Sequence, residues 1–75
     1  MLTKLQTKVV HMMADCNLNV TAVARVTNYH PNTIMYHLNR IQEVTGQNPR
    51  TFYGVVELLR QIDQEGGESH DSKGT

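Results

Sequence analysis

The sequence lacks the cysteines with which small domains often stabilise a small core through disulfides or a bound metal ion. Cys16 is its single cysteine. No internal disulfide can therefore form, and no second thiol is present for a structural zinc site. We expect the fold to be stabilised by packing, with no metal and no cofactor.

Long hydrophobic runs are also missing. The longest runs, such as residues 12–14 and 34–36, contain three apolar residues. A membrane-spanning helix needs about 20 such residues, and the core of a signal peptide needs about 7 to 15. We therefore expect a cytoplasmic protein that has no membrane partner.

The chain has no overall excess of charge of either sign. Seven basic and seven acidic residues give a formal net charge of zero, so total charge predicts neither a nucleic-acid nor an acidic partner. Residues 1–62 nevertheless carry six cations and three carboxylates, whereas residues 63–75 carry four carboxylates and one lysine. A length of 75 residues allows one small core, and residues 63–75 contain no apolar side chain. We expect one domain at 1–62 and a disordered acidic tail at 63–75.

The first predicted helix begins with a capping signal. Thr3 is followed three residues later by Gln6, and in this pattern each side chain can satisfy a free backbone N–H group near the other. Apolar residues then recur at steps of three and four from Leu2 to Cys16, which predicts one buried helical face. The pattern ends at residues 17–19.

Residues 19–31 predict a short helix, a tight turn and the start of another helix. Asn19 can cap a second helix of about two turns. Asn28 tolerates the left-handed backbone conformation that a tight reversal needs. Pro31 disfavours helical geometry at His30 and suits the first turn of a third helix, which we predict to begin at Pro31.

Two further helices complete an all-α fold of three to four helices. The third has apolar residues at helical spacing and Gly46 placed to end it. Asn48 and Pro49 repeat the signal of a cap followed by a proline, which predicts the start of the fourth helix. The predicted apolar stripes are Ile34, Leu38, Ile41 and Val44 on the third helix, and Phe52, Val55, Val56, Leu59 and Ile62 on the fourth.

The second and third helices have the layout of a helix-turn-helix unit, in which the later helix can enter a DNA major groove. At 100° per residue, the side of the third helix opposite Ile34 carries residues suited to reading bases. Asparagine can pair with adenine, arginine with guanine, and backbone N–H groups around Asn32 and Thr33 can hold a phosphate. This face is formed by Asn32, Tyr36, Asn39 and Glu43, with Thr33, Met35 and Arg40 on its flanks.

These residues also resemble a known family, the C-terminal helix-turn-helix domain of the PucR and sugar-diacid type of bacterial transcription regulators. The family motif reads His-Arg-Asn-Thr-Leu-x-Tyr-Arg-Leu-x-Arg-Ile, and the resemblance extends over about residues 5–62. The resemblance implies a homologous DNA-binding domain, usually fused to larger sensory regions, which we expect here to stand alone from Met1. The matching residues are His30, Asn32, Thr33, Tyr36, Leu38, Arg40 and Ile41, with a similar loop at Thr45-Gly46 and Asn48-Pro49.

The sequence departs from what is usual in the family at two arginine positions of the motif and at one position before it. Pro31 and His37 stand where the family tends to have arginine, and Thr27 stands where an aliphatic residue is usual. Two cationic contacts to DNA are therefore missing, which predicts weaker non-specific binding. The predicted DNA-binding residues are Arg25, His30, Asn32, Thr33, Met35, Tyr36, His37, Asn39 and Arg40.

An interaction module that does not itself bind DNA is the alternative from another functional class. The apolar arc of the fourth helix spans about 160°, which is wider than a minor core stripe requires. We expect a symmetric homodimer through this helix or through the first helix, with Leu58, Ile62 and Val55 as the contact residues of the fourth. Docking of a protein partner on the same surface is the other possibility. The sequence leaves two roles open for Tyr36, half-buried packing and a contact with DNA.

Catalysis is not expected from this sequence. His30 and His37 are two helical turns apart, about 10 Å, which is too far for both to ligate one metal ion. His11 and Cys16 are five residues apart and lie on different sides of one helix. A thiol within an apolar stripe is typical of an inert core cysteine.

Overall fold

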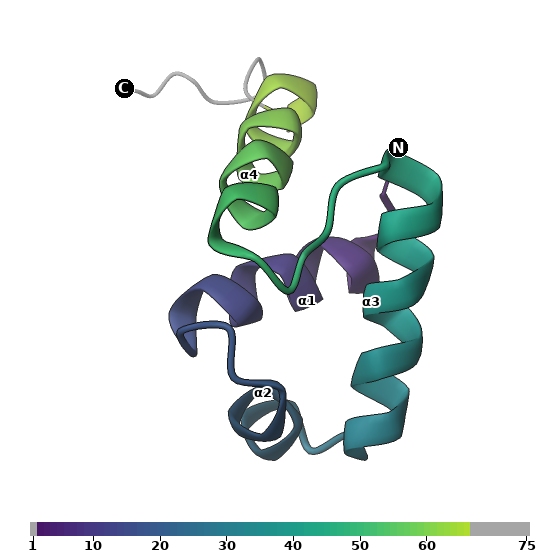
Figure 1. The fold of residues 1–75 in the computed structure, drawn as a ribbon, viewed down its shortest axis with the longest axis vertical. Helices are drawn as coiled ribbons and strands as arrows, with labels where there is room; N and C mark the ends of the chain where they lie inside the picture. The colour runs from purple at the N-terminus through teal and green to yellow at the C-terminus, as the bar shows by residue number, and fades with distance from the viewer. Residues whose placement is uncertain (1, 67–75) are drawn as a thin grey trace.

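A computed structural model of the chain describes residues 2–66, including the side chains of residues 2–64. The described part consists of four helices: α1 (Lys4–Asp15), α2 (Val20–Thr27), α3 (Pro31–Thr45) and α4 (Phe52–Gly66). Helix α1 lies in the middle and packs against the other three helices, and α2 also packs against α3. Helices α4 and α2 lie above and below α1, and α3 stands at the right, beside the start of α1 (Figure 1). The all-α prediction is confirmed.

The caps predicted from the sequence position the first two helices. Gln6 N–H donates to Thr3 Oγ1 over 3.0 Å, and the Gln6 side chain accepts from Thr3 N–H over 2.9 Å. Ala22 N–H donates to Asn19 Oδ1 over 3.1 Å. Each cap satisfies an N–H group that has no partner within its own helix. The predicted starts of α1 and α2 are therefore confirmed.

Left-handed backbone conformations form the turns between the helices. Asn28 has φ 66° at the end of α2, and Gly46 has φ 77° at the end of α3, as the sequence predicts. Asn17 and Leu18 have φ 57° and 66° between α1 and α2. Leu18 is the unexpected member of this set, because a bulky residue rarely adopts a positive φ.

The core is aliphatic and is built around α1. Its members are fully or almost fully buried, and all four helices contribute to it. The arrangement fixes one face of α3 against α1 and α2 and leaves the opposite face in solvent. The core residues are Val9, Val10, Met13, Val23, Ala24, Ile34, Leu38, Ile41, Val55 and Leu58.

Helix α4 differs from its prediction at both ends. Asn48 and Pro49 do not start it, because the Asn48 side chain accepts a hydrogen bond from Arg50 N–H and forms a turn there. The first turn is capped instead by Thr51, whose Oγ1 accepts from Gly54 N–H over 3.0 Å. The helix then continues to Gly66, four residues into the segment predicted to be disordered. The rest of that segment, residues 67–75, lies outside the described residues.

Candidate nucleic-acid interface

The solvent-facing side of α3 is the candidate interface. Ile34, Leu38 and Ile41 are fully buried, so the helix has a single defined orientation on the core. The opposite side consists of exposed, mostly polar side chains. The exposed residues of this side are Asn32, Thr33, Tyr36, Asn39, Arg40 and Glu43.

Tyr36 is exposed rather than packed in the core. Its side chain is 60% accessible, and its ring lies edge-on to His37 with the ring centroids 5.4 Å apart. His37 is half-buried, and Met35, on the other flank, packs partly against the core. The hydroxyl of Tyr36 is thus on the surface, whereas His37 and Met35 present only part of their side chains.

The start of α3 corrects one prediction. Pro31 has no N–H group, Asn32 N–H donates to His30 Nδ1 over 3.0 Å, and Thr33 N–H donates to His30 O over 2.9 Å. The backbone groups predicted to hold a phosphate are therefore already hydrogen-bonded. Because Nδ1 of His30 accepts, its ring proton is on Nε2, which can donate to a ligand.

Helix α2 and the turn after it border the start of α3. Thr21, Arg25, Asn28 and Tyr29 line an open, shallow hollow together with His30 and Pro31. Arg25 is exposed in the last turn of α2, with no carboxylate within 4.0 Å among residues 2–64. A cation therefore lies beside the N-terminal part of the exposed α3 face.

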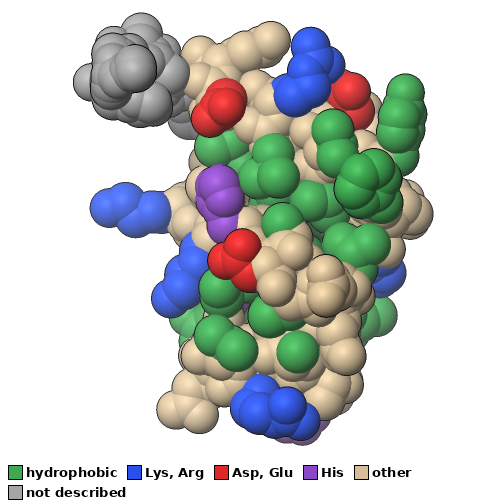
Figure 2. All heavy atoms as spheres, turned by 90° about the vertical axis from the view of Figure 1, so that its left-hand side faces the viewer, with side chains coloured by type: hydrophobic (Ala, Val, Ile, Leu, Met, Phe, Trp, Pro, Cys, Tyr) green, Lys and Arg blue, Asp and Glu red, His purple; other side chains and the backbone are tan. Residues whose placement is uncertain are grey.

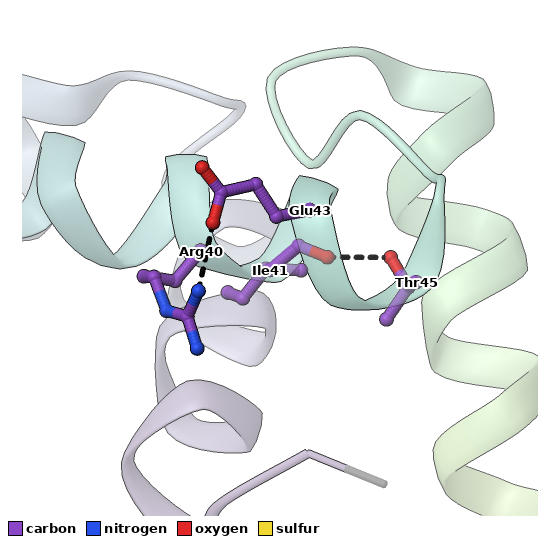
Figure 3. Close-up of polar contacts among 4 residues, drawn as sticks. All are labelled: Arg40, Ile41, Glu43 and Thr45. Carbon is purple, nitrogen blue, oxygen red and sulfur yellow. Dashed lines mark hydrogen bonds and ion pairs between the residues drawn. The ribbon is translucent and has the colours of Figure 1, made fainter.

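Three polar side chains of the face have partners within the chain. Arg40 Nη1 lies 2.8 Å from Glu43 Oε1, which partly neutralises its charge (Figure 3). Asn39 Oδ1 accepts a hydrogen bond from Arg50 Nη2. At the last turn of α3, Thr45 Oγ1 donates to Ile41 O over 2.7 Å (Figure 3). Sequence reasoning missed Arg50, because it lies eleven residues from Asn39.

The comparison with protein families identifies this arrangement. A family model described as the PucR C-terminal helix-turn-helix domain matches residues 6–62. The chain belongs to this family. The match covers all of α2 and α3, and it indicates a DNA-binding role in transcription regulation. No curated protein and no solved structure matches the chain.

One departure of this PucR-type domain from the family pattern is accommodated inside α2. Thr27 stands where an aliphatic residue is usual, and it is half-buried. Its Oγ1 donates to Val23 O over 2.7 Å, so the hydroxyl group is hydrogen-bonded within the helix.

The residues predicted for a dimer interface are in a different place from the one expected. Leu58 is fully buried and Val55 is 4% exposed, and both belong to the core of a single chain. Ile62 also packs partly against this core. The assignment of Leu58 and Val55 to an interface is therefore wrong, because α1 already covers the face of α4 that carries them.

A different apolar surface is exposed on the domain. Phe52 and Tyr53, at the start of α4, are 74% and 75% exposed. Figure 2 shows hydrophobic side chains gathered on this side of the molecule, where α4 and the end of α1 lie. They surround a hollow lined by Ala14, Asn17, Leu18, Phe52, Val55, Val56 and Leu59.

The structure offers no obvious catalytic centre among the described residues. His11 is exposed and Cys16 is half-buried at the end of α1. Residues 2–64 contain no group of three or more His, Cys, Asp or Glu side chains arranged to hold a metal ion. No helix within residues 2–66 is long and apolar enough to cross a membrane.

Proposed function

We propose that this domain binds double-stranded DNA sequence-specifically as part of a transcription regulator, with α3 as the recognition helix. The observation that carries the proposal is the division of α3 into two faces. Ile34, Leu38 and Ile41 are fully buried, whereas the opposite side presents amide, hydroxyl and guanidinium groups to solvent. These groups match the donors and acceptors of the major groove. The role needs no cofactor and no catalytic step.

The proposed contacts divide into two kinds. Residues near the centre of the exposed face read bases, and residues around it hold the sugar–phosphate backbone. Met35 can touch a thymine methyl group through its accessible part, and His30 can donate from Nε2 to a phosphate. The proposed base-reading set is Asn32, Tyr36, Asn39 and Arg40, and the backbone-holding set is Thr33, His37 and Arg25.

The salt dependence of binding tests this proposal. A fluorescein-labelled random 30-base-pair duplex is titrated with the protein at 50 and 200 mM salt, and binding is followed by fluorescence anisotropy. Two to three cationic contacts give a slope of about −1.8 to −2.7 in log K against log salt, so affinity falls roughly 12- to 42-fold between the two conditions. Absence of binding at 50 mM salt contradicts the proposal.

We further propose that the domain works as a homodimer in the bacterial cytoplasm. A single copy has few cations on its recognition side, and pairing two copies raises affinity by binding two half-sites about 34 Å apart. The measurement is the mass by light scattering at about 100 μM protein, where we expect twice 8.5 kDa. A monomeric mass at this concentration counts against the homodimer.

A second candidate function, protein–protein interaction without DNA binding, is favoured by Phe52 and Tyr53. Two large aromatic side chains exposed beside an apolar hollow are typical of interaction surfaces. The two functions separate in one pair of measurements. If the domain only docks another protein, we expect it to bind no duplex at 50 mM salt and to be monomeric at about 100 μM.

A further inference from the structure

The loop between α3 and α4 is held firmly in place. Pro49 is fully buried, and Asn48 Oδ1 accepts a hydrogen bond of 3.0 Å from Arg50 N–H. Thr51 N–H donates to Asn48 O over 3.1 Å. Gly54 lies so close to the Asn48 carbonyl group that a Cβ atom there would be 1.9 Å from its oxygen. These contacts fix the backbone from which the Arg50 side chain extends.

Arg50 reaches from this loop to the exposed face of α3. Its Nη2 donates to Asn39 Oδ1. A guanidinium group has only donors, so the amide oxygen of Asn39 must face Arg50. The amide nitrogen of Asn39, with two N–H donors, is then directed away from Arg50. The contact therefore sets which end of the Asn39 amide is available on the recognition side.

The charge of Arg50 is not compensated within the described part of the chain. Arg40 pairs with Glu43, and Arg60 pairs with Glu57 over 3.1 Å. Arg50 contacts the neutral amide of Asn39 instead, and no carboxylate of residues 2–64 lies within 4.0 Å of it. A cation in this position is attracted toward the phosphates on either side of a major groove.

We propose that Arg50 is a positioning residue for base reading, which holds the Asn39 amide with its nitrogen toward the DNA. The inference rests on the proposed function. An amide presented in this way donates to acceptors of the major groove, which are guanine N7 and O6, adenine N7 and thymine O4. It discriminates against cytosine, whose N4 group is itself a donor. The bidentate pairing of asparagine with adenine is disfavoured, because it also needs the Asn39 amide oxygen, which already accepts from Arg50.

Site selection from a pool of duplexes with 16 randomised base pairs tests the proposal. The pool is offered to the unaltered protein, Asn39→Ala, Arg50→Met and the double variant. Methionine preserves the aliphatic stem of the half-buried Arg50 side chain and removes its donors, and the turn hydrogen bond at Asn48 uses only the Arg50 backbone. Circular dichroism confirms that each variant is folded before selection.

We expect Asn39→Ala and Arg50→Met to lose base preference at the same base pair. Asn39→Ala reduces the base preference at that position by about 2- to 10-fold, the range of a single hydrogen bond. Arg50→Met reduces the preference at the same position, and the double variant loses no more than Asn39→Ala alone. Arg60→Ala, which removes an arginine from α4, leaves the preference unchanged, because α4 does not contact α3 within the described residues.

Four results would overturn the inference. Arg50→Met could weaken binding to all sequences equally, with a smaller salt slope, which would make Arg50 a phosphate contact only. The two single variants could also have additive effects, or affect different base pairs, and Asn39 would then be independent of Arg50. If the unaltered protein selects no sequence, the proposed function itself fails, and the inference fails with it.

Discussion

Replacing Gly54 with alanine should destabilise the domain, although alanine is the better helix former. Gly54 is in the first turn of α4, where Gly→Ala normally stabilises a helix by up to about 1 kcal/mol. The added Cβ would lie 1.9 Å from Asn48 O and 2.6 Å from its carbonyl carbon. The loop must therefore retreat by about 1.1 Å to reach even the 3.0 Å limit of real contacts.

The obstacle is backbone, so no side-chain rotation can relieve the clash. Forced overpacking typically costs about 1–3 kcal/mol, and because backbone must shift here, we place the cost of this substitution at about 3 kcal/mol. After subtraction of the gain in helix propensity, Gly54→Ala should reduce the free energy of unfolding by about 2 kcal/mol. A domain of this length has roughly 4 to 11 kcal/mol in total.

Urea unfolding followed by circular dichroism at 222 nm measures this change. We expect the midpoint to fall by about 2 M, given a denaturant slope of about 1 kcal/mol/M for a small domain. Gly46→Ala is the matched control, because Gly46 has φ 77° with no atom near the new Cβ, so it incurs backbone strain without a clash. A Gly54→Ala variant as stable as the unaltered protein would refute the close approach of the loop.

Four other substitutions, of which Phe52→Glu is a control, test three further parts of the structure. Leu58→Glu should unfold the chain, because it buries a charge in the core, whereas Phe52→Glu should leave the circular dichroism spectrum intact; a folded Leu58→Glu domain would contradict the core assignment. Asn19→Ala should cost about 1 kcal/mol by removing the cap on Ala22 N–H and lower the melting temperature by about 4–8 °C; an unchanged melting temperature would exclude the cap. Arg25→Ala should reduce the salt slope of DNA binding by about 0.9 in anisotropy titrations, and an unchanged slope would remove Arg25 from the phosphate contacts.

Local signals in the sequence were sufficient to predict most of the fold. The capping box at Thr3, the cap at Asn19 and the left-handed residues Asn28 and Gly46 each act within a few residues, and all four are confirmed. The helical spacing of apolar residues likewise predicts the burial of Ile34, Leu38 and Ile41 on α3, but it fails for Val44, which is 47% exposed near the end of that helix. Features that depend on one short segment can be predicted because the same atoms interact in any helical context.

Features that depend on the packing of distant segments could not be predicted in the same way. Periodicity shows that α4 has a wide apolar face, but not that α1 covers Val55 and Leu58 while Phe52 stays exposed. The contact between Arg50 and Asn39 joins a loop to a helix and leaves no periodic signal. His30 likewise uses its side chain and carbonyl group to occupy N–H groups that the sequence alone leaves free.

The location of the DNA contact is the central claim, and an NMR titration tests it most directly. A ¹⁵N-labelled sample is titrated at low salt with an unlabelled 16-base-pair duplex, and the backbone amide shifts are mapped onto the helices. The account predicts the largest changes along α3, at Asn32, Tyr36 and Asn39, with a smaller set near Arg25. Changes concentrated around Phe52 on α4, or no changes at all, would contradict it.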